Sequence, residues 1–339
     1  MDKLRVGILG ATGVVGQVFL KILKDHPWFE VESLYASEKS SGKKVSSGNE
    51  RGKELVVKEA TVDSILRDKL DIIFSAVSDD KAGFIELSLA KKGGKVFSNA
   101  SANRLDPEVP LVVPEINMDH LEILDQKAGY IVTNGNCSTI GTALGMAPLL
   151  QFKPRDIVVT SLQSVSGAGY PGVSSMDILG NVIPFIGGEE YKIVNESKKI
   201  FGIPQDGKIV SSNMDLTATA TRVPVMVGHM ISVSIVPGNA VSEEEFKKAY
   251  FQYGNGKITG KFPSLPRRSI CLMDEEDRPQ PILEMNSPDY RNDMEVFVGR
   301  LRSSGHRLSA IFLINNLVRG AAGASILNAE IMAKMEGMI

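Results

Sequence analysis

A glycine-rich turn near the start of the chain limits the folds that this sequence can adopt. Arg5 to Leu9 is apolar enough for a buried strand, and the apolar residues of Gln17 to Lys24 recur at helical spacing. Between them lies Gly10-Ala-Thr-Gly-Val-Val-Gly16. Glycines permit a tight turn there, and backbone N–H groups at the helix start can bind a pyrophosphate. The spacing is G-x-x-G-x-x-G rather than G-x-G-x-x-G, so its position between strand and helix carries the prediction of a dinucleotide site.

Strand and helix patterns alternate along the first part of the chain. Further buried strands are predicted at Phe29 to Ala36, Leu70 to Val77 and Lys95 to Asn99, and a helix at Lys81 to Lys92. This alternation indicates an α/β fold whose N-terminal sheet is parallel and of the Rossmann type. The polar stretch Ser37 to Glu54 resembles a surface loop.

The pattern changes from about Ile157. Longer alternating segments, Ile157 to Ser164 and His229 to Val236, predict a second, mixed sheet in an α+β domain. Leu313 to Met335 has helical spacing and small residues, so it could return to the first domain. A chain of 339 residues exceeds what one core usually organises. We therefore expect a nucleotide-binding domain of residues 1–134 plus 315–339, and a second domain of residues 135–314.

Composition and charge exclude several classes of function. The net charge is -2, with 38 basic and 40 acidic residues scattered along the chain, so neither nucleic acid nor a membrane surface is an expected partner. No signal segment is recognisable, and no apolar run approaches the roughly 18 residues that span a bilayer. Only two cysteines occur, which favours a reducing, cytoplasmic location. No cluster of residues predicts a metal site.

Cys137 is the candidate nucleophile. It follows the strand Tyr130 to Val132 and precedes a helical run through Leu150, so it lies at a predicted helix N-terminus. The helix dipole and free N–H groups there favour a thiolate and should lower the pKa of the thiol. A single cysteine is otherwise more often a small buried hydrophobe. Cys271 lies among apolar residues without such a helix start, and we interpret it as structural.

His229 is the candidate acid/base, because a thiolate that attacks a carbonyl needs a group to manage a proton. It follows Gly228 directly and begins a predicted strand. The alternative is a strand-end histidine with ordinary hydrogen bonds. The three other histidines, His26, His120 and His306, are predicted at surface or capping positions.

Two loops complete the candidate site. The segment Ser161 to Gly172 runs from a strand into small residues that can let backbone approach a ligand. Serines and lysines after the second strand, from Ser37 to Lys44, would suit a 2′-phosphate, which favours NADP. Glu38 keeps NAD open, because a carboxylate there can bond the ribose 2′-OH.

Together these motifs closely resemble aspartate-semialdehyde dehydrogenase of the archaeal and fungal branch. The resemblance rests on four features in order: the glycine turn, Asn136-Cys-Ser-Thr139, Gln163-Ser-Val-Ser-Gly-Ala-Gly169, and Arg222 seven residues before His229. It extends from Gly7 to the segment 316–323.

The resemblance implies NADP-dependent reduction of aspartyl phosphate to the semialdehyde with release of phosphate. This reaction is a step in the biosynthesis of threonine, of methionine, and of lysine through diaminopimelate. Cys137 would form a thioester, with His229 as acid/base and Gln163 orienting the intermediate. The implied substrate-binding residues are Arg104, Asn136, Glu189, Lys192 and Arg222. The implied cofactor-binding residues are Gly10, Thr12, Gly13, Val14, Val15, Gly16, Ser37, Lys39, Ser40, Ser75, Ser166, Gly167 and Asn316.

Within this set, Arg222 would pair with the substrate carboxylate through its planar fork, and Arg104 and Lys192 would hold phosphate. Glu189 would lie near the substrate amine and Asn316 near the nicotinamide amide. A homodimer or homotetramer built through the catalytic and dimerisation domain, residues 135–314, is also implied.

The sequence leaves two rival functions open. A malonyl-CoA-type acyl-CoA reductase shares the fold and much of the loop 166–172, but its residues around the cysteine differ. A non-catalytic NADP-binding regulator would keep only the glycine turn, and the combination of Cys137, Gln163 and His229 argues against it. The bacterial branch often has arginine after the second strand, where this chain has Lys39 between Ser37 and Ser40.

Overall fold

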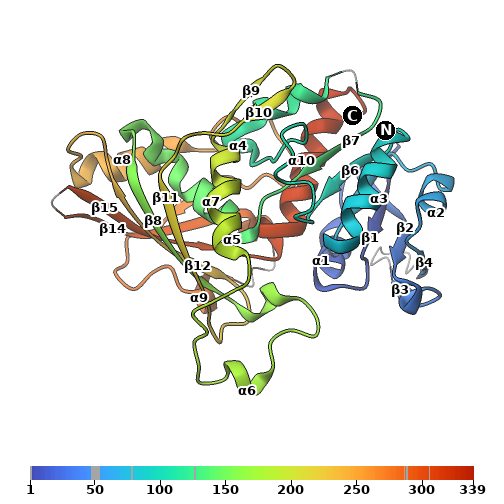
Figure 1. Cartoon of the computed structure of the whole chain (residues 1–339), viewed down its shortest axis with the longest axis horizontal. Helices are drawn as coiled ribbons and strands as arrows, with labels where there is room; N and C mark the ends of the chain where they lie inside the picture. Colours follow the sequence, from blue (N-terminus) through green and yellow to red (C-terminus); the bar gives the residue numbers. More distant parts are fainter. Residues whose placement is uncertain are drawn as a thin grey trace.

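The N-terminal part of the chain forms a seven-stranded sheet (Figure 1). The computed structural model describes residues 2–46, 54–77, 79–125, 127–285, 287, 289–304 and 306–339. All neighbouring strands of this sheet are parallel except the antiparallel edge pair β3 and β4. In spatial order the strands are β3 (Lys44–Ser46), β4 (Glu54–Glu59), β2 (Phe29–Ala36), β1 (Leu4–Leu9), β5 (Ile72–Ser75), β6 (Lys95–Ser98) and β7 (Tyr130–Thr133).

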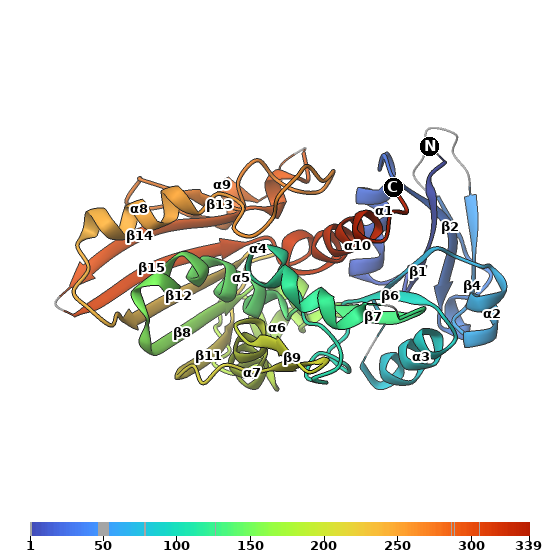
Figure 2. The same cartoon turned by 90° about the horizontal axis from the view of Figure 1, so that it is seen from above.

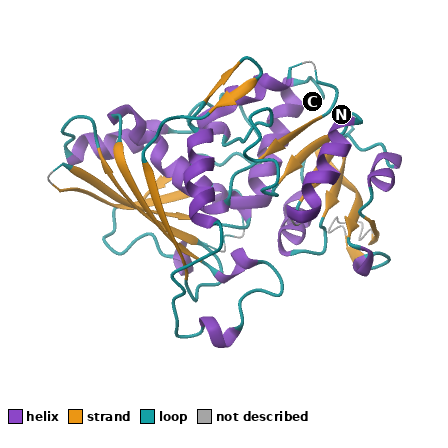
Figure 3. Cartoon of the chain, in the orientation of Figure 1, coloured by secondary structure: helices purple, strands orange, loops and turns teal. Residues whose placement is uncertain are grey.

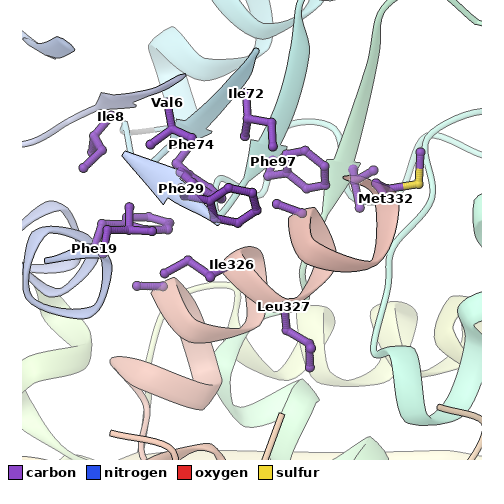
Figure 4. Close-up of a cluster of buried hydrophobic side chains, with 14 of the residues drawn as sticks. Val6, Ile8, Phe19, Phe29, Ile72, Phe74, Phe97, Ile326, Leu327 and Met332 are labelled. Carbon is purple, nitrogen blue, oxygen red and sulfur yellow. The ribbon is translucent and has the colours of Figure 1, made fainter. Parts of the chain in front are cut away.

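Helices cover both faces of this sheet because its strands are apolar on both sides. On one face, α1 (Val14–Leu23) and α10 (Gly323–Met335) pack over a core that includes Phe19, Phe74 and Ile326 (Figure 4). On the other face, α2 (Val62–Arg67) and α3 (Asp79–Lys91) contribute Ile65 and Leu89. The sheet is therefore a buried central layer.

A six-stranded mixed sheet forms the second half of the fold (Figure 2). Its central strands β8, β12, β15 and β14 pair antiparallel, whereas the edge strands β11 and β13 pair parallel with their neighbours. The order is β11 (Leu216–Arg222), β8 (Arg155–Gln163), β12 (His229–Val236), β15 (Arg307–Ile314), β14 (Val296–Ser304) and β13 (Ile270–Leu272). The predicted combination of a parallel Rossmann-type sheet and a mixed second sheet is confirmed.

One face of the second sheet is covered by α5 (Cys137–Met146), α7 (Glu189–Ile200) and α8 (Glu243–Tyr253). Residues of β12 alternate between this core and the opposite face, where Ser232 and Ser234 remain partly exposed. Gly141 and Gly145, one turn apart, let α5 lie close to the sheet: a Cβ at Gly145 would be 2.3 Å from the ring of Phe312.

Shorter elements connect these layers. A long extension between β8 and α7 is mostly loop and includes the short α6 (Figure 3). The short elements are α4 (Pro114–Asn117), α6 (Ser175–Ile178), α9 (Pro281–Glu284), β9 (Ile203–Gln205), β10 (Lys208–Val210) and 3₁₀ helices at Glu38–Ser40, Met118–Leu124, Ala147–Phe152, Val165–Ala168 and Asn292–Met294.

The chain returns to the first sheet through a π-helix, Val318–Ala322, that continues into α10. The expected helix from Leu313 was wrong at its start, since β15 extends to Ile314 and a turn follows. A buried ion pair fixes the π-helix: Arg319 Nη2 lies 2.6 Å from Glu115 Oε2. Glycine is needed within it, because a Cβ at Gly320 would be 2.6 Å from Cys137 Cβ.

The segment 37–54 was also predicted incorrectly as loop alone. It contains the 3₁₀ helix Glu38–Ser40, the edge strand β3 and the first residue of β4, while residues 47–53 lie outside the described part. Short strands with polar, exposed residues on one side give little apolar alternation for sequence analysis to find. Within the described residues, no helix combines the length and apolar character needed to cross a bilayer.

We predict that Gly145→Ala lowers the free energy of unfolding by about 1–3 kcal/mol, because the added methyl must displace the Phe312 ring from a packed core. Gly83→Ala in α3 is the matched control, since among the described residues its Cβ would meet only Ala102 Cβ, at an ordinary 3.5 Å. Denaturant unfolding measures both. Equal stability of the two variants would contradict this account of how α5 packs.

Candidate active site

Two adjoining clefts run across the carboxyl ends of the first sheet toward the second. The first, of about 610 Å³, is lined by Cys137, Arg104 and Asn136. The second, of about 560 Å³, is lined by Gly10, Thr12 and Ser37. Gly13, Ala76, Val77 and Tyr170 contribute to both walls. These volumes are typical of cofactor and ligand sites, and their position outside the carboxyl ends of parallel strands is where such folds bind nucleotides.

The glycine turn leaves the first N–H groups of α1 without a side-chain cap, because the N-cap residue is Gly13. Gly10 has a φ of +79°, and its N–H donates to Tyr35 O at 2.8 Å. A Cβ at Gly16 would lie 2.2 Å from Gly10 O, so only glycine lets the helix begin against this turn. The geometry fits an anionic group at the start of α1.

The predicted cofactor residues divide into those on the walls and those behind them. Thr12, Val14, Val15, Ser166, Gly167 and Asn316 line the clefts together with Gly10, Gly13 and Ser37. Lys39 and Ser40 lie in the 3₁₀ helix just after Ser37. Ser75 is fully buried in β5, whereas its neighbours Ala76 and Val77 reach the wall. Lys81 also lines the second cleft, and its position in a long polar helix pattern gave no sign of this.

Cys137 is the first residue of α5, as its sequence position predicts. Asn136 caps that helix: its Oδ1 accepts from the N–H groups of Ser138 at 3.0 Å and Thr139 at 3.3 Å. Gly320 of the π-helix packs against the Cys137 side chain from the first-sheet side. The thiol therefore lies where the two halves of the fold meet.

Glu189, the first residue of α7, gathers three predicted site residues. Its carboxylate accepts from Asn136 Nδ2 at 2.9 Å, Gln163 Nε2 at 3.1 Å and Lys192 Nζ at 3.3 Å. The structure thus brings Asn136, Gln163, Glu189 and Lys192 together beside Cys137, although they come from three different elements. Carboxylate acceptors strengthen such bonds relative to neutral ones.

Glu196 is a site residue that sequence reasoning missed. It is 1% exposed, and its two oxygens accept from Arg104 Nη1 at 3.0 Å and from the Asn136 N–H at 2.6 Å. Arg104 also donates from Nη2 to Asn99 O at 2.6 Å, which leaves its buried Nε without a partner in the described part of the chain. Glu196 therefore orients the arginine that lines the first cleft.

Lys199 lies one turn further along α7. Its buried ammonium donates to the carbonyls of Arg104 at 2.6 Å, Asp106 at 2.5 Å and Val109 at 2.7 Å. Burial lowers its pKa to about 8. The sequence did contain a signal for these contacts, since positions 189, 192, 196 and 199 recur at helical spacing on one face of α7.

His229 and Arg222 lie side by side behind the loop at Gly167. A Cβ on Gly167 would be 3.1 Å from His229 Nε2 and 3.0 Å from Arg222 Nη1. Arg222 Nη1 donates to Ser164 O at 2.8 Å, and His229 Nδ1 accepts from the Ser164 N–H at 3.0 Å. Asn316 joins this group through bonds to Ser164 and Ser166. The histidine thus packs against the inner side of the loop 164–167, whose Gly167 lines the first cleft.

The pKa shifts differ from the sequence expectation at one residue. Burial and the Glu189 carboxylate raise the pKa of the Cys137 thiol to about 12, against the lowering effects of Arg104, the Ser138 N–H and Arg222. The predicted lowering by the helix start was wrong for the isolated chain, because desolvation outweighs it. Burial and Arg222 lower the pKa of His229 to about 3, so its imidazole is neutral at pH 7.

The other histidines do not all occupy the expected surface positions. His26 and His120 are 1% and 0% exposed, whereas His306 is exposed. His26 Nε2 bonds to Glu330 Oε1 of α10 at 2.7 Å, and His120 Nε2 lies 3.1 Å from Gly202 O. Sequence reasoning missed both because their partners are distant along the chain. Among the described residues, no His, Cys, Asp or Glu side chains group as metal ligands.

The fold and the site define a class: an α/β oxidoreductase with a nucleotide-binding sheet, a mixed second sheet and a cysteine at their junction. Family models agree. The semialdehyde dehydrogenase NAD binding domain matches residues 5–124, and the semialdehyde dehydrogenase dimerisation domain matches residues 146–319.

Whole-chain relatives narrow this class. Aspartate-semialdehyde dehydrogenase of Archaeoglobus fulgidus is 44% identical over 97% of this chain and 98% of its own length, and that of Aspergillus fumigatus is 41% identical over 99% of both. The chain belongs to the aspartate-semialdehyde dehydrogenase family, which confirms the resemblance inferred from the motifs.

Solved structures give the same result. The crystal structure of aspartate semialdehyde dehydrogenase with NADP from Candida albicans matches with a TM-score of 0.86 at 35% identity, covering 100% of both chains. The Vibrio cholerae aspartate semialdehyde dehydrogenase II complexed with ASA matches with a TM-score of 0.80 at 26% identity, covering 98% of this chain and 99% of that one.

We predict that alkylation of Cys137 by iodoacetamide is slow at pH 7 and rises about tenfold per pH unit through pH 9, because a pKa of about 12 leaves the thiol protonated throughout. Glu189→Gln removes the nearby negative charge, so it should lower this pKa and speed alkylation at pH 8. Mass spectrometry of a Cys271→Ser background isolates the reaction. A plateau below pH 8 would show that the thiolate is already favoured.

We predict that Glu196→Ala lowers the free energy of unfolding by about 3–5 kcal/mol, because it leaves the buried Arg104 guanidinium without its counter-charge. The control is Glu243→Ala, which removes an exposed pair with Lys247 on α8 and should cost at most about 1 kcal/mol. Denaturant unfolding compares them. Similar losses in the two variants would remove Glu196 from this structural role.

Proposed function

We propose that the chain is an NADP-dependent aspartate-semialdehyde dehydrogenase that reduces L-aspartyl-4-phosphate to L-aspartate 4-semialdehyde and releases phosphate. The observation that carries this proposal is the placement of Cys137 and Arg104 on one cleft that continues to the start of α1. The nucleophile, a cation for phosphate and an anion-binding helix start thus share one continuous site. The chain's membership of the aspartate-semialdehyde dehydrogenase family supports the proposed substrate.

In the oxidative direction, the Cys137 thiolate adds to the aldehyde carbon and an electron pair moves to the oxygen. The residues of the two clefts would hold NADP, which would supply the hydride acceptor that this adduct needs to become a thioester. Phosphate then displaces the thiolate to give the acyl phosphate. His229 is the proposed acid/base, and Gln163 orients the intermediate.

The remaining predicted residues bind the ends of the substrate. Arg222 would pair with its carboxylate, and Glu189 would lie near its amine. Arg104, which lines the first cleft, would bind phosphate, with Lys192 adding a second cation. On the cofactor, Asn316 and Ser166 would bind the nicotinamide end, while Ser37, Lys39 and Ser40 would favour a 2′-phosphate.

We further propose that residues 1–134 with 315–339 form the cofactor domain and residues 135–314 the catalytic and dimerisation domain of a homodimer or homotetramer. The partly exposed face of the second sheet supports a second copy as the partner, together with exposed apolar residues in the extension before α7 such as Met176 and Phe185. The family model for this region carries the same description. A reducing, cytoplasmic location fits its two free cysteines.

The rival functions fit less well. A malonyl-CoA-type reductase would have no use for a phosphate site, whereas Arg104 is held toward the first cleft by Glu196. A regulator without catalysis would not need Asn136 and Gln163 ordered around the thiol by Glu189.

We predict that the purified protein oxidises aspartate semialdehyde with NADP only when phosphate is present, because phosphate must release the acyl group. Cys137→Ala should reduce kcat at least about 10⁴-fold, since no thioester can form. Cys271→Ala is the matched control and should retain activity. The assay follows absorbance of the reduced nicotinamide, with NAD run in parallel.

Turnover that does not depend on phosphate, or higher activity with malonyl-CoA, would reject the substrate assignment. Equal use of NAD would reject the cofactor preference alone.

A further inference from the structure

The second cleft is lined by charged side chains of both signs. Two are carboxylates, Glu38 just after β2 and Glu59 at the end of β4, and one is a cation, Lys81 in the first turn of α3. All three residues are exposed. Among the described residues that line this cleft, no others are charged. Its walls therefore carry one more negative charge than positive.

This charge balance is unfavourable for the phosphate that distinguishes NADP from NAD. That phosphate, on the adenosine 2′-oxygen, adds a charge of about −1.5 to −2 at pH 7. In folds of this type the adenosine ribose lies at the end of the second strand, here beside Ser37 and Glu38. A carboxylate there favours the ribose hydroxyl of NAD, whereas a cation favours the phosphate. Binding of NADP therefore needs a cation that offsets Glu38 and Glu59.

Only some of the nearby lysines can supply that cation. Lys39, which the sequence favours for this task, lies in the 3₁₀ helix after Ser37 but is not among the described residues that line the cleft. Lys58 of β4 is paired with Asp68 at 2.6 Å. Lys81 lines the cleft and forms no ion pair with any described residue. Its ammonium group is thus available to a ligand.

The topology brings Lys81 to the same cleft as Ser37. Strands β2 and β5 pair with opposite edges of β1, and Ser37 follows β2 whereas α3 follows β5. Ile85, one turn beyond Lys81, lines the same cleft, so one face of α3 forms this wall. The pyrophosphate of a dinucleotide has its own partners in the uncapped N–H groups at the start of α1. The 2′-phosphate is the anion that still requires a cation.

We propose that Lys81 is a specificity-determining residue that pairs with the 2′-phosphate of NADP and makes the second cleft prefer NADP to NAD. This inference rests on the proposed function, because it concerns the cofactor of that reaction. A lysine ammonium binds phosphate oxygens as a point charge on a flexible stem. Because Glu38 and Glu59 oppose the same phosphate, loss of Lys81 weakens binding of NADP and leaves binding of NAD unchanged.

Calorimetry with two adenosine fragments tests this pairing without turnover. Adenosine 2′,5′-bisphosphate and adenosine 5′-monophosphate differ only in the 2′-phosphate. We expect Lys81→Ala to raise the Kd of the bisphosphate about tenfold, as loss of a hydrogen bond to a charged group does, and to leave the Kd of the monophosphate unchanged. Lys81→Arg keeps the charge and should keep the preference for the bisphosphate.

Lys91→Ala is the matched control. It removes the same charge from an exposed position at the end of α3, about 15 Å along the helix, so neither Kd should change. Equal weakening of both fragments by Lys81→Ala would place the ammonium at the 5′-phosphate and overturn the proposal. An unchanged Kd for the bisphosphate would overturn it as well.

Steady-state kinetics give a second readout. Lys81→Ala should raise KM for NADP about tenfold with little change in kcat, because the 2′-phosphate is remote from the reacting carbon. A fall in kcat with unchanged KM would contradict the role in binding. A wild-type protein that prefers the bisphosphate through Lys81 but does not oxidise aspartate semialdehyde would reject the proposed function and leave this inference standing. A wild-type protein without that preference would overturn the inference.

Discussion

The buried carboxylate of Glu196 is the constraint on which the site depends most. It accepts from Arg104, in the loop after β6 of the first sheet, and from the backbone of Asn136, at the start of α5. A carboxylate that is 1% exposed is stable only when its oxygens are fully paired. Arg104 and Asn136 must therefore hold their positions for the helix α7 to pack. The hydrogen bonds that this one carboxylate requires thus fix the wall of the first cleft.

This constraint extends along α7 in both directions. Toward its start, Glu189 orders Asn136 and Gln163, and toward its end, Lys199 binds three carbonyls of the loop that carries Arg104. The opposite side of Cys137 is closed by Gly320 in the π-helix, which Arg319 anchors to Glu115. Rigid elements from both halves of the fold thus determine the surroundings of the thiol, and loops contribute mainly the wall at 164–172.

Whether a feature could be predicted from the sequence depends on how far apart in the chain its interacting residues lie. The glycine turn and the Cys137 helix start are local patterns, and they lie where the pattern predicts. The roles of Ser164 and Glu196 depend on partners 65 and 92 residues away, which no local spacing reveals. The burial of His26 was not predicted for the same reason, because its partner Glu330 lies 304 residues further along the chain. The edge strand β3 was missed because a three-residue strand with exposed side chains has almost no pattern.

The thiol illustrates why a correct position did not give a correct charge state. A helix N-terminus stabilises an anion by about 0.3–1 kcal/mol, less than the roughly 1.4 kcal/mol that one pKa unit represents. Burial together with Glu189 outweighs this, so the pKa of Cys137 rises although the helix start is where the sequence placed it. Since Glu189 is one of the two causes, a cation that pairs with Glu189 must favour the thiolate. The ionisation of Cys137 is therefore coupled to what binds at Glu189, and Lys192, 3.3 Å away, already offsets part of that charge.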